Sequence, residues 1–294
     1  MITYDSLSEL AKAAEAEGIS VAEVVLRDQA GEMEISKEQL TAIMDQRLSV
    51  MIQSAARGED PALKSNSGLT GGEAALMAAY TAGGNTIGGS FTSRAMSIAL
   101  AVAGCNAAMG KIVASPTAGS CGILPAALLT AMEQRQIPRE KIVSALFTAS
   151  GIGMVIARTA SISGAEGGCQ AECGSAAAMA AAALCELFGG TPEMTMHAAA
   201  LAIKNLMGLV CDPVAGLVEV PCIKRNAGGV MIAIAAADMV LAGIRSKIPP
   251  DEVLTAMKAV GDSMPCALRE TAQGGLAATP CGSRIAQDIF SSRT

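Results

Sequence analysis

The chain has very few aromatic residues. Among its 294 residues there are no Trp, two Tyr and four Phe, although 51% of the residues are hydrophobic. The apolar part is therefore made mainly of Ala, Val, Ile, Leu and 17 Met. Ala and Met favour helices, and the aromatic signature of sheets is thin. This composition predicts an all-α fold, a compact multi-helix domain whose buried Ala-rich helices approach one another closely.

The chain also lacks an uninterrupted apolar run of the roughly 20 residues that cross a membrane. The charge-free runs 95–110, 112–132 and 228–237 are short or are broken by Ser, Asn, Gly or Pro. The first residues, M-I-T-Y-D-S, have neither the basic start nor the apolar stretch of a signal peptide. We therefore expect a soluble protein with buried helices and no membrane partner.

An excess of positive charge is missing as well. The formal net charge is −6, and no basic cluster or set of stacking aromatics is present, so no nucleic-acid partner is expected. Nine Cys is an odd number in a chain without a secretory signal. Such usage is typical of a reducing cytoplasm, where thiols are free or bound to metal rather than paired as disulfides. We expect a cytoplasmic protein.

Charged residues are concentrated at the start of the chain. We expect one domain over residues 1–294, with residues 1–60 as a more polar helical segment. Ser-x-x-Glu and Ser-x-x-Gln patterns are capping boxes that open amphipathic helices, and three helices are predicted before Gly58. These helices begin after Thr3 or Ser6, after Ser20 and after Ser36.

In residues 61–294 we expect most of the chain to form buried, Ala-rich helices. Gly, Pro and Thr signals mark their ends. The tail L-R-E-T-A-Q-G-G-L-A-A-T-P-C-G-S-R shows no clear periodicity, so no helix is predicted there. Helices are predicted from Pro138 to about Thr159, from Cys173 to Gly189, from Thr191 toward Leu209, over about 227–244, and from Pro249 onward.

Three loops rich in Gly, Ser and Thr follow Pro61, at residues 64–73, 83–94 and 115–122. Taken singly, each is explained as a helix cap or a tight turn. Three such loops in about 60 residues are more than connection requires. Backbone N–H and hydroxyl groups at helix starts bind anions, so the set favours a binding site.

Three cysteines lie at Gly or Pro turns. Cys169 follows two glycines, Cys211 precedes Asp-Pro, and Cys222 follows Pro221. Free N–H groups at such turns stabilise thiolates, which suits a metal cluster. The C-x2-C pair of zinc sites and the C-x2-C-x2-C run of ferredoxins are both absent. Spacing alone therefore leaves a cluster as one hypothesis beside simple packing.

Other cysteines favour packing roles. Cys105 and Cys185 fall inside Ala-rich helical runs, where a thiol is a small apolar side chain. Cys121 belongs to the third loop and is a candidate lining residue. Cys169 and Cys173 share a helix face only if the helix has begun by Cys169, which the preceding glycines disfavour.

Several motifs resemble one family. They are G-A-E-G-G-C-Q-A-E-C-G, C-D-P-V-A-G-L-V-E-V-P-C-I-K-R-N, A-S-P-T-A-G-S-C-G-I-L-P, S-N-S-G-L-T-G-G-E and G-G-L-A-A-T-P. Together they resemble the alpha chain of the iron–sulfur-dependent L-serine dehydratases, over essentially the whole chain. In that family three cysteines hold a [4Fe–4S] cluster, and the resemblance assigns this to Cys169, Cys211 and Cys222. It also implies an all-helical catalytic domain.

The resemblance implies a partner as well. Single-chain members carry a regulatory domain before the catalytic one, and two-chain members have it on a beta subunit. This chain starts with catalytic-type sequence, so it resembles the alpha subunit of a two-chain enzyme. Some single-chain members place a C-terminal Cys on the cluster. Cys281 is the candidate for that fourth ligand, although 13 residues follow it.

The implied reaction is the deamination of L-serine to pyruvate and ammonia. Three protein ligands leave one iron open, and an open iron is a Lewis acid for the serine hydroxyl. The base is unassigned: His197, Glu166, Glu172 and a residue of the partner chain are candidates. A core role is the more common outcome for a His in an Ala-rich helix. Donors for the substrate are expected from Ser65, Ser67, Thr70, Gly71, Ser115, Thr117, Gly119, Ser120, Arg94 and Lys111, with Lys64 nearby.

Rival functions remain open. A pyridoxal-phosphate dehydratase needs a Schiff-base lysine, and neither Lys204 nor Lys224 lies in a recognisable motif. An iron–sulfur L-cysteine desulfidase, or a related hydro-lyase, differs by sulfur for oxygen in the substrate and is not separated by the sequence. A non-catalytic iron–sulfur protein is disfavoured because electron carriers normally saturate all four irons.

Overall fold

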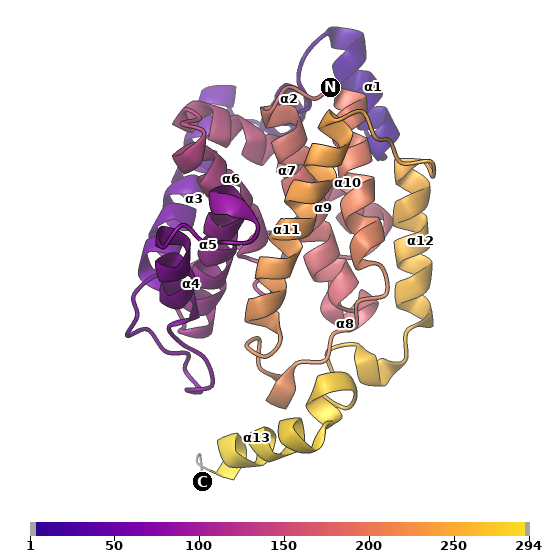
Figure 1. Ribbon diagram of the computed structural model, residues 1–294. Helices are drawn as coiled ribbons and strands as arrows, with labels where there is room; N and C mark the ends of the chain where they lie inside the picture. Colours follow the sequence, from indigo (N-terminus) through magenta and orange to yellow (C-terminus); the bar gives the residue numbers. More distant parts are fainter. Residues whose placement is uncertain (1–3, 292–294) are drawn as a thin grey trace.

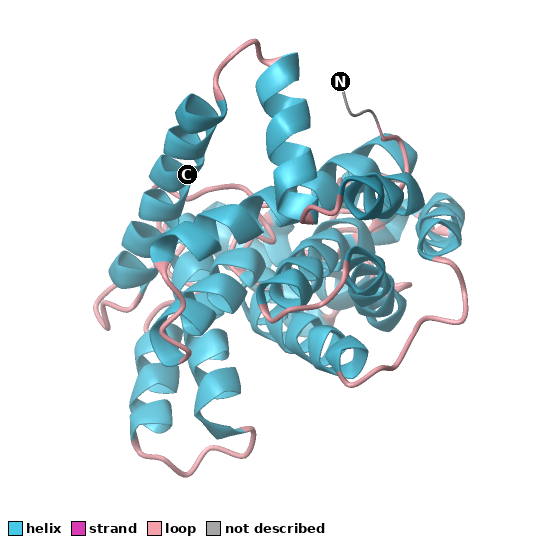
Figure 2. Cartoon of the chain, turned by 90° about the horizontal axis from the view of Figure 1, so that it is seen from above, coloured by secondary structure: helices cyan, strands magenta, loops and turns pink. Residues whose placement is uncertain are grey.

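The computed structural model describes residues 4–291, and within that range the chain is helical, with no strand (Figures 1 and 2). Two isolated β-bridges are the only extended pairings in this range. The all-α prediction is confirmed. The helices are α1 Leu7–Glu17, α2 Val21–Glu32, α3 Lys37–Gly58, α4 Glu73–Ala82, α5 Gly89–Ala107, α6 Ile123–Gln134, α7 Arg139–Thr159, α8 Gly164–Gly167, α9 Ser175–Leu187, α10 Pro192–Leu206, α11 Cys222–Leu241, α12 Pro250–Ser263 and α13 Pro280–Ser291, with short turns η1 Gln170–Gly174, η2 Val214–Gly216, η3 Cys266–Leu268 and η4 Gly275–Ala278.

The first three helices form as their N-cap residues predict. Ser6, Ser20 and Ser36 each accept a hydrogen bond from a backbone N–H of the first helical turn. Helix α3 ends at Gly58, so the prediction of three helices before that residue is confirmed. The alternative first cap, Thr3, lies outside the described residues.

The two predicted capping boxes differ. At Ser36 both halves of the box are present, because Gln39 also accepts a hydrogen bond from the backbone N–H of Ser36. At Ser20 only the serine half is seen. The carboxylate of Glu23 instead pairs with Arg27 and with Lys37 of the next helix. A competing tertiary ion pair therefore replaces the local bond there.

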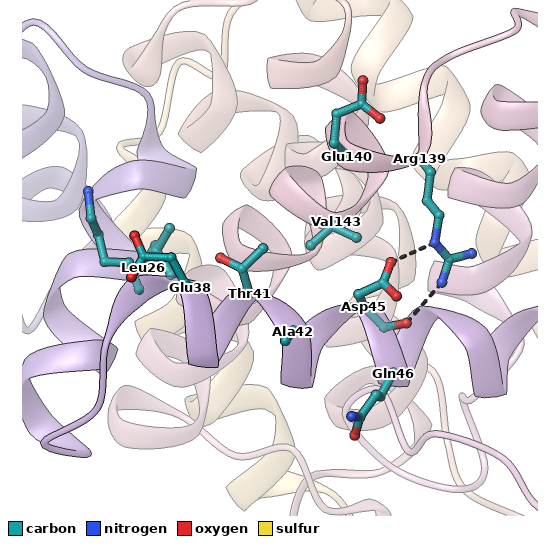
Figure 3. A pocket seen from close by; sticks show the side chains of 10 residues that line it. Leu26, Glu38, Thr41, Ala42, Asp45, Gln46, Arg139, Glu140 and Val143 are labelled. Atoms are coloured by element: carbon teal, nitrogen blue, oxygen red, sulfur yellow. Dashed lines mark hydrogen bonds and ion pairs between the residues drawn. The ribbon is translucent and has the colours of Figure 1, made fainter.

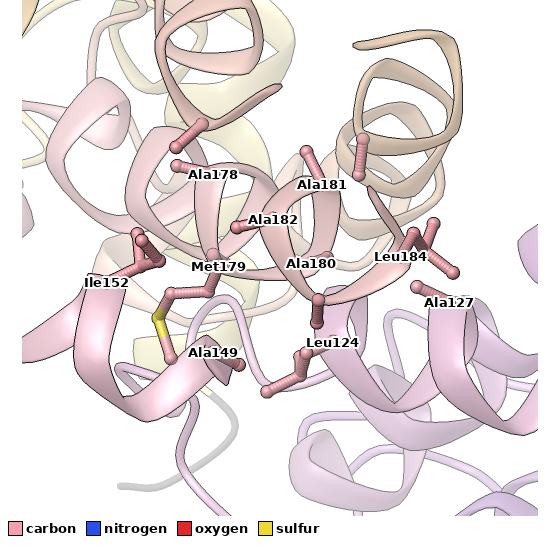
Figure 4. Close-up of a cluster of buried hydrophobic side chains, with 14 of the residues drawn as sticks. Leu124, Ala127, Ala149, Ile152, Ala178, Met179, Ala180, Ala181, Ala182 and Leu184 are labelled. Atoms are coloured by element: carbon pink, nitrogen blue, oxygen red, sulfur yellow. The ribbon is translucent and has the colours of Figure 1, made fainter. Parts of the chain in front are cut away.

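Helix α9 lies at the centre of the molecule. All its residues from Ser175 to Cys185 are buried, and α6, α7, α10 and α11 pack against it. Most of its side chains are single methyl groups, so four neighbours approach its axis closely. Figure 4 shows Met179 beside Ala149 and Ile152 of α7. The predicted buried Ala-rich helix is confirmed.

Helix α7 is the one described helix long and apolar enough to cross a membrane by length and composition. Its charge-free run, residues 142–157, is not among the three runs named above. In the fold 61% of its apolar window is buried, against α9 and α2. Core helices of soluble proteins commonly pass the same test, so this is weak evidence for a membrane span.

Two boundaries differ from the sequence prediction. Helix α11 begins at Cys222, five residues before the predicted start near residue 227. Helix α13 was not predicted at all. The aperiodic tail straddles short 3₁₀ turns and the first turn of α13, so no single period describes it. In Figure 1, α13 lies at the lower end of the bundle, where it contacts η2 and η4.

Candidate functional site

Cys169 lies at the entrance to the central helix. The preceding Gly168 has φ +75°, and a Cβ there would meet the Leu209 carbonyl oxygen at 3.0 Å, so only glycine suits the position. A π-helical turn, Gln170–Gly174, follows and leads into α9. Such turns are frequent at functional sites. The expectation that Gly167 and Gly168 delay the helix beyond Cys169 is wrong. Cys169 lies at the start of the helical segment that leads into α9.

Cys211 is held by the C-terminal segment. Its backbone N–H donates to the Leu268 carbonyl at 2.8 Å, and its own carbonyl accepts from the Glu270 N–H at 2.8 Å. Beyond it, the Val214 N–H donates to the Val220 carbonyl and closes the loop that ends at Cys222. The loop 211–222 and the C-terminal tail therefore meet at Cys211. The entrance to α9 joins them, because the backbone N–H of Gln170 donates to the carbonyl of Leu209.

The thiols influence one another. Burial, with negative charge on Cys169 as the second cause, raises the pKa of Cys222 to about 12. Burial and the same neighbour also raise the pKa of Cys211. Cys169 is the exception, because its hydrogen bond with the thiol of Cys173 lowers its pKa and the Arg225 guanidinium adds to this. We call Cys169, Cys173, Cys211 and Cys222 the cysteine group.

A fourth sulfur was assigned no role from the sequence. The Sγ atoms of Cys169 and Cys173 are 3.4 Å apart. Cys173 is 1% exposed, and the hydrogen bond with Cys169, together with burial, raises its pKa well above the ordinary value. The helix has begun by Cys169, so the two side chains do share one face.

The cysteine group is not shaped for a single metal ion. Within the described range, no three His, Cys, Asp or Glu side chains converge closely enough to ligate one ion. A cubane cluster binds each thiolate through a different iron, so its ligands need not converge on one point. Buried thiols that raise one another's pKa ionise together only beside a strong cation. The donor set therefore fits a cluster better than a mononuclear ion.

Glu172 reaches the same group. Its Oε2 lies 4.0 Å from Cys211 Sγ. A Cβ at Gly164 would come within 2.9 Å of that carboxylate, and one at Gly119 within 3.3 Å. These glycines therefore leave room for the carboxyl group. Burial raises the pKa of Glu172, although a hydrogen bond with Thr117 opposes the shift.

Glu166 is placed differently. Its side chain is exposed, and its Oε2 accepts a hydrogen bond from Ser161 Oγ at 2.7 Å. Of the two carboxylates that flank Cys169, Glu172 therefore faces the cysteine group and Glu166 faces solvent.

The third loop, 115–122, is fastened beside Cys222 by Asn226. The Asn226 side chain is fully buried, donates to the carbonyls of Gly119 and Cys222 at 2.8 and 2.9 Å, and accepts from the Gly122 N–H at 2.8 Å. Sequence reasoning missed this residue, although the motif P-C-I-K-R-N contains it. The contact places the loop at the start of α11.

The loop offers hydroxyl groups at this position. Thr117 Oγ1 and Ser120 Oγ lie 3.1 Å apart, and Thr117 also bonds to Glu172. Ser115 is 4% exposed, and its Oγ has no hydrogen-bond partner. Buried hydroxyls are normally satisfied, so the Ser115 hydroxyl is a candidate donor to a bound molecule.

The first loop, 64–73, is joined to the cysteine group by a carboxylate. Ser67 Oγ and Thr70 Oγ1 donate to Glu219 Oε2 at 2.9 and 3.0 Å. Glu219 is 4% exposed and lies three residues before Cys222. Two hydroxyls expected to bind a substrate anion thus hold an internal carboxylate. The sequence carries no local signal for this, because the partners are about 150 residues apart.

The remaining members of this loop are placed by its backbone. Ser65 donates its N–H to the Thr70 carbonyl at 2.9 Å, and its Oγ lies 3.3 Å from Ser67 Oγ. Gly71 pairs with the exposed Lys64 in an isolated bridge. The loop is a closed turn whose hydroxyls point toward Glu219.

The second loop and its arginine lie elsewhere. The Arg94 guanidinium pairs with Glu133 of α6 and with Glu59, which follows α3. These bonds join three helices and occupy the donors that were expected to hold a substrate carboxylate. Lys111 is exposed. The contacts of Arg94 with Glu133 and Glu59 give no support to a role at the cysteine group.

His197 lines a different part of the molecule, whereas Cys281 lies on α13, which packs against η2 in the loop 211–222. His197 lines a cavity of about 410 Å³ with residues of α1 and of the segment before α12. Its Nδ1 is buried without a partner, and its Nε2 is 3.6 Å from Glu193. Cys281 is exposed at the start of α13.

A surface cleft of about 790 Å³ lies between α3 and α7 (Figure 3). Arg139 bonds to Asp45 across it, as the figure shows. None of its lining residues belongs to the cysteine group or the three loops. This cleft therefore adds nothing to the candidate site.

Comparison with known proteins agrees with the motifs. The family model described as "Serine dehydratase alpha chain" matches residues 16–277. The "Probable L-serine dehydratase, alpha chain" of Bacillus subtilis is 49% identical over 287 residues, which cover 98% of this chain and 95% of that protein. The "L-serine dehydratase, alpha chain" of Peptoniphilus asaccharolyticus is 46% identical over 273 residues, 93% and 94% of the two chains. "L-serine dehydratase 1" of Escherichia coli is 46% identical over 181 residues, 61% of this chain and 40% of that protein.

Proposed function

The chain belongs to the serine dehydratase alpha chain family, and on that premise we propose that it is the catalytic chain of an L-serine dehydratase, a lyase that converts L-serine to pyruvate and ammonia. One observation carries the proposal to this chain's own residues. Cys169, Cys211 and Cys222 come from distant parts of the sequence and act on one another electrostatically in one largely buried group. The hydroxyl-bearing loop 115–122 is fastened beside them.

We propose that these three cysteines hold a [4Fe–4S] cluster. The support is the donor set: mutually coupled thiols, an adjacent guanidinium, and spacing unsuited to a single ion. When bound, the cluster supplies an iron without a protein ligand, a Lewis acid for the hydroxyl of serine. The exposed Cys281 remains only a predicted fourth ligand.

Loop 115–122 is the proposed binding element for the substrate. Ser115 Oγ is buried with no protein partner, and Thr117 and Ser120 carry further hydroxyls on the same loop. Hydroxyl and backbone N–H donors suit the carboxylate of an amino acid. Asn226 fixes the position of this loop relative to Cys222. The first loop is linked through Ser67 and Thr70 to Glu219, three residues before Cys222.

Glu172 is the proposed proton-transfer residue of this chain. It is the carboxyl group beside Cys211, and burial raises its pKa. A carboxyl group with a raised pKa, placed beside the thiols, is suited to transfer a proton to the departing hydroxyl oxygen. The α-proton of serine needs a separate base, which a partner chain is a candidate to supply.

A separate beta chain is the proposed partner, and the cytoplasm the proposed location. The relatives named alpha chain match almost end to end, and that name implies a further subunit. The longer Escherichia coli protein has 60% of its length outside the match, which is room for a regulatory domain. All nine cysteines are free, as expected in a reducing compartment.

The test is pyruvate release from L-serine by anaerobically purified, iron- and sulfide-reconstituted protein, with and without a candidate beta chain. We expect a brown protein whose pyruvate formation is lost in air and is enhanced by the beta chain. L-Cysteine serves as the competing substrate. A colourless, air-stable, fully active enzyme would exclude the cluster. Faster release of sulfide from L-cysteine than of pyruvate from L-serine would exclude the proposed substrate.

A further inference from the structure

One hydrogen bond between two thiols in the described part of the chain joins a proposed cluster ligand to a cysteine without a role. Cys169 Sγ and Cys173 Sγ are 3.4 Å apart, and both residues are almost fully buried. No other hydrogen bond between two thiols occurs in residues 4–291. The proposed cluster uses Cys169 but has no need of Cys173, so the contact calls for a separate explanation.

The geometry of this pair suits a disulfide. A disulfide needs about 2.05 Å between sulfurs and about 4.4–6.8 Å between Cα atoms. Residues four apart in a helical turn are separated by about 6 Å. The two sulfurs therefore need to move together by only about 1.4 Å. Glycines lie on both sides, at Gly168 and Gly174, and permit a small backbone adjustment.

We propose that Cys169 and Cys173 are a redox pair, and that hydrogen peroxide joins them as a disulfide when the protein holds no cluster. The consequence rests on the proposed function: the bond removes one cluster ligand until a dithiol reductant restores it. A disulfide that closes so short a loop stabilises a fold little. Its role is therefore modification rather than structural support.

The reaction balances with peroxide as the oxidant. The sulfur of Cys169 attacks one peroxide oxygen, the O–O bond breaks, and a sulfenic acid and one water form. The sulfur of Cys173 then attacks the sulfenic sulfur, the S–O bond breaks, and a second water leaves. Two thiols are oxidised by two electrons and one peroxide is reduced to two waters. Hydrogen peroxide is small enough to reach this buried pair, whereas a larger disulfide oxidant is not.

Cys173 thereby protects Cys169. Without a second thiol within reach, a sulfenic acid is oxidised further to sulfinic acid, which ordinary thiols do not reduce. With Cys173 at 3.4 Å, the sulfenic acid condenses first. Oxidation is then reversible, and the cluster site is recoverable.

The test uses cluster-free full-length protein, reduced, freed of reductant and treated with hydrogen peroxide. Free thiols are then alkylated, and the chain is cleaved after glutamate. Glu172 lies between the two cysteines, so the fragments on either side stay linked only if the disulfide is present. We expect linked fragments that separate on reduction. The treated protein should also carry two fewer alkylated thiols than the untreated protein. Absence of linkage, or linkage of Cys169 to Cys211 or Cys222, would overturn the pair.

Variants identify the partner. Cys173→Ala, and Cys173→Ser in case alanine impairs folding, should abolish the linkage and yield sulfinic acid at Cys169. Cys185→Ala is the matched control, since Cys185 is buried in α9 and lies in the same glutamate fragment as Cys173. It should behave as the parent chain. Loss of linkage in this control, with linkage retained in the Cys173 variants, would assign the bond to Cys185 instead.

A second readout is iron content after anaerobic reconstitution. Peroxide-treated parent protein should take up little iron until dithiothreitol is added, and then recover to the level of untreated protein. Iron uptake in the absence of any linkage would overturn the redox pair alone. A reversible linkage in a protein that never takes up iron would overturn the proposed function alone.

Discussion

Single residues decide what the cysteine group can hold. Gly164 and Gly119 leave the space that the carboxyl of Glu172 occupies, and Arg225 places a guanidinium beside Cys169. Arg225 is itself held by Asp212, which is 3% exposed. Asp212 also accepts the backbone N–H of Leu276. Charge balance and the position of the tail are therefore set by the same few side chains.

Replacing Cys211 by serine should abolish iron binding, because a hydroxyl is a far poorer ligand for an iron–sulfur cluster than a thiolate. Cys211→Ser protein, reconstituted anaerobically, is expected to retain little iron or acid-labile sulfide per chain. Cys185→Ser is the control, because Cys185 is equally buried but lies inside α9 beside Thr195. Equal iron loss in both variants would mean that the cysteines have been sorted wrongly.

Replacing Glu172 by glutamine should lower kcat while the iron content stays unchanged. Removing a proton-transfer residue commonly costs about 10²–10⁴-fold. The comparison is Glu166→Gln, whose parent carboxylate is exposed and bonds to Ser161. We expect pyruvate formation by that variant to remain within a few-fold of the parent. Similar rates for both variants would remove Glu172 from the mechanism.

At the scale of helices, close approach between backbones determines the packing. Helices α3 and α5 meet where Gly58 faces the carbonyl of Ala101. The small residues of α9 allow four helices to surround it. Local caps start the helices, but it is these small residues that set how near the axes lie. The loops between the helices are then carried to fixed positions.

The substitution Gly58→Ala should destabilise the fold by at least about 1–3 kcal/mol. A Cβ at this position would lie 1.8 Å from the Ala101 carbonyl oxygen, so α3 and α5 must separate. Gly31→Ala is the matched control, since Gly31 lies in α2 and a Cβ there meets nothing within 4 Å. That change should be neutral or stabilise by up to about 1 kcal/mol. Urea unfolding of both variants measures the difference, and equal midpoints would contradict the close approach.

At the scale of the whole molecule, the proposed cluster ligands connect parts of the chain that are distant in sequence. Cys169 begins the central helix, Cys211 bonds to the C-terminal segment, and Cys222 begins α11. A ligand that binds only the folded arrangement stabilises it by mass action. Binding at this junction therefore acts on the fold as a whole and not on one helix.

Iron-loaded protein should melt at a higher temperature than the reduced, cluster-free protein. For a chain of this size each kcal/mol of binding free energy raises Tm by about 2–4 °C. Anaerobic calorimetry of the two forms measures the shift. The Cys211→Ser variant should show no shift after the same reconstitution. A parent protein that takes up iron without any change in Tm would argue for adventitious iron outside the junction.

Local sequence features determined the fold class, the starts of the first helices and the candidate cysteines of this protein. An apolar composition poor in aromatics predicts the all-α fold, serine caps predict where α1, α2 and α3 begin, and Gly or Pro turns single out Cys169, Cys211 and Cys222. Each of these signals lies within a few residues along the chain. The start of α11 and the whole of α13 escaped prediction, since irregular turns next to them mask any period.

Only the tertiary structure decided which of the three loops reach the cysteine group. Glu219 draws in the first loop and Asn226 the third, whereas Arg94 anchors the second to α3 and α6. It also decided that Glu172 faces the thiols while Glu166 faces water. Each outcome depends on a contact between different elements, and the contacts of Glu219 and Asn226 join residues over 100 positions apart in sequence. Such contacts follow from how the helices pack, and no local pattern of residues encodes them.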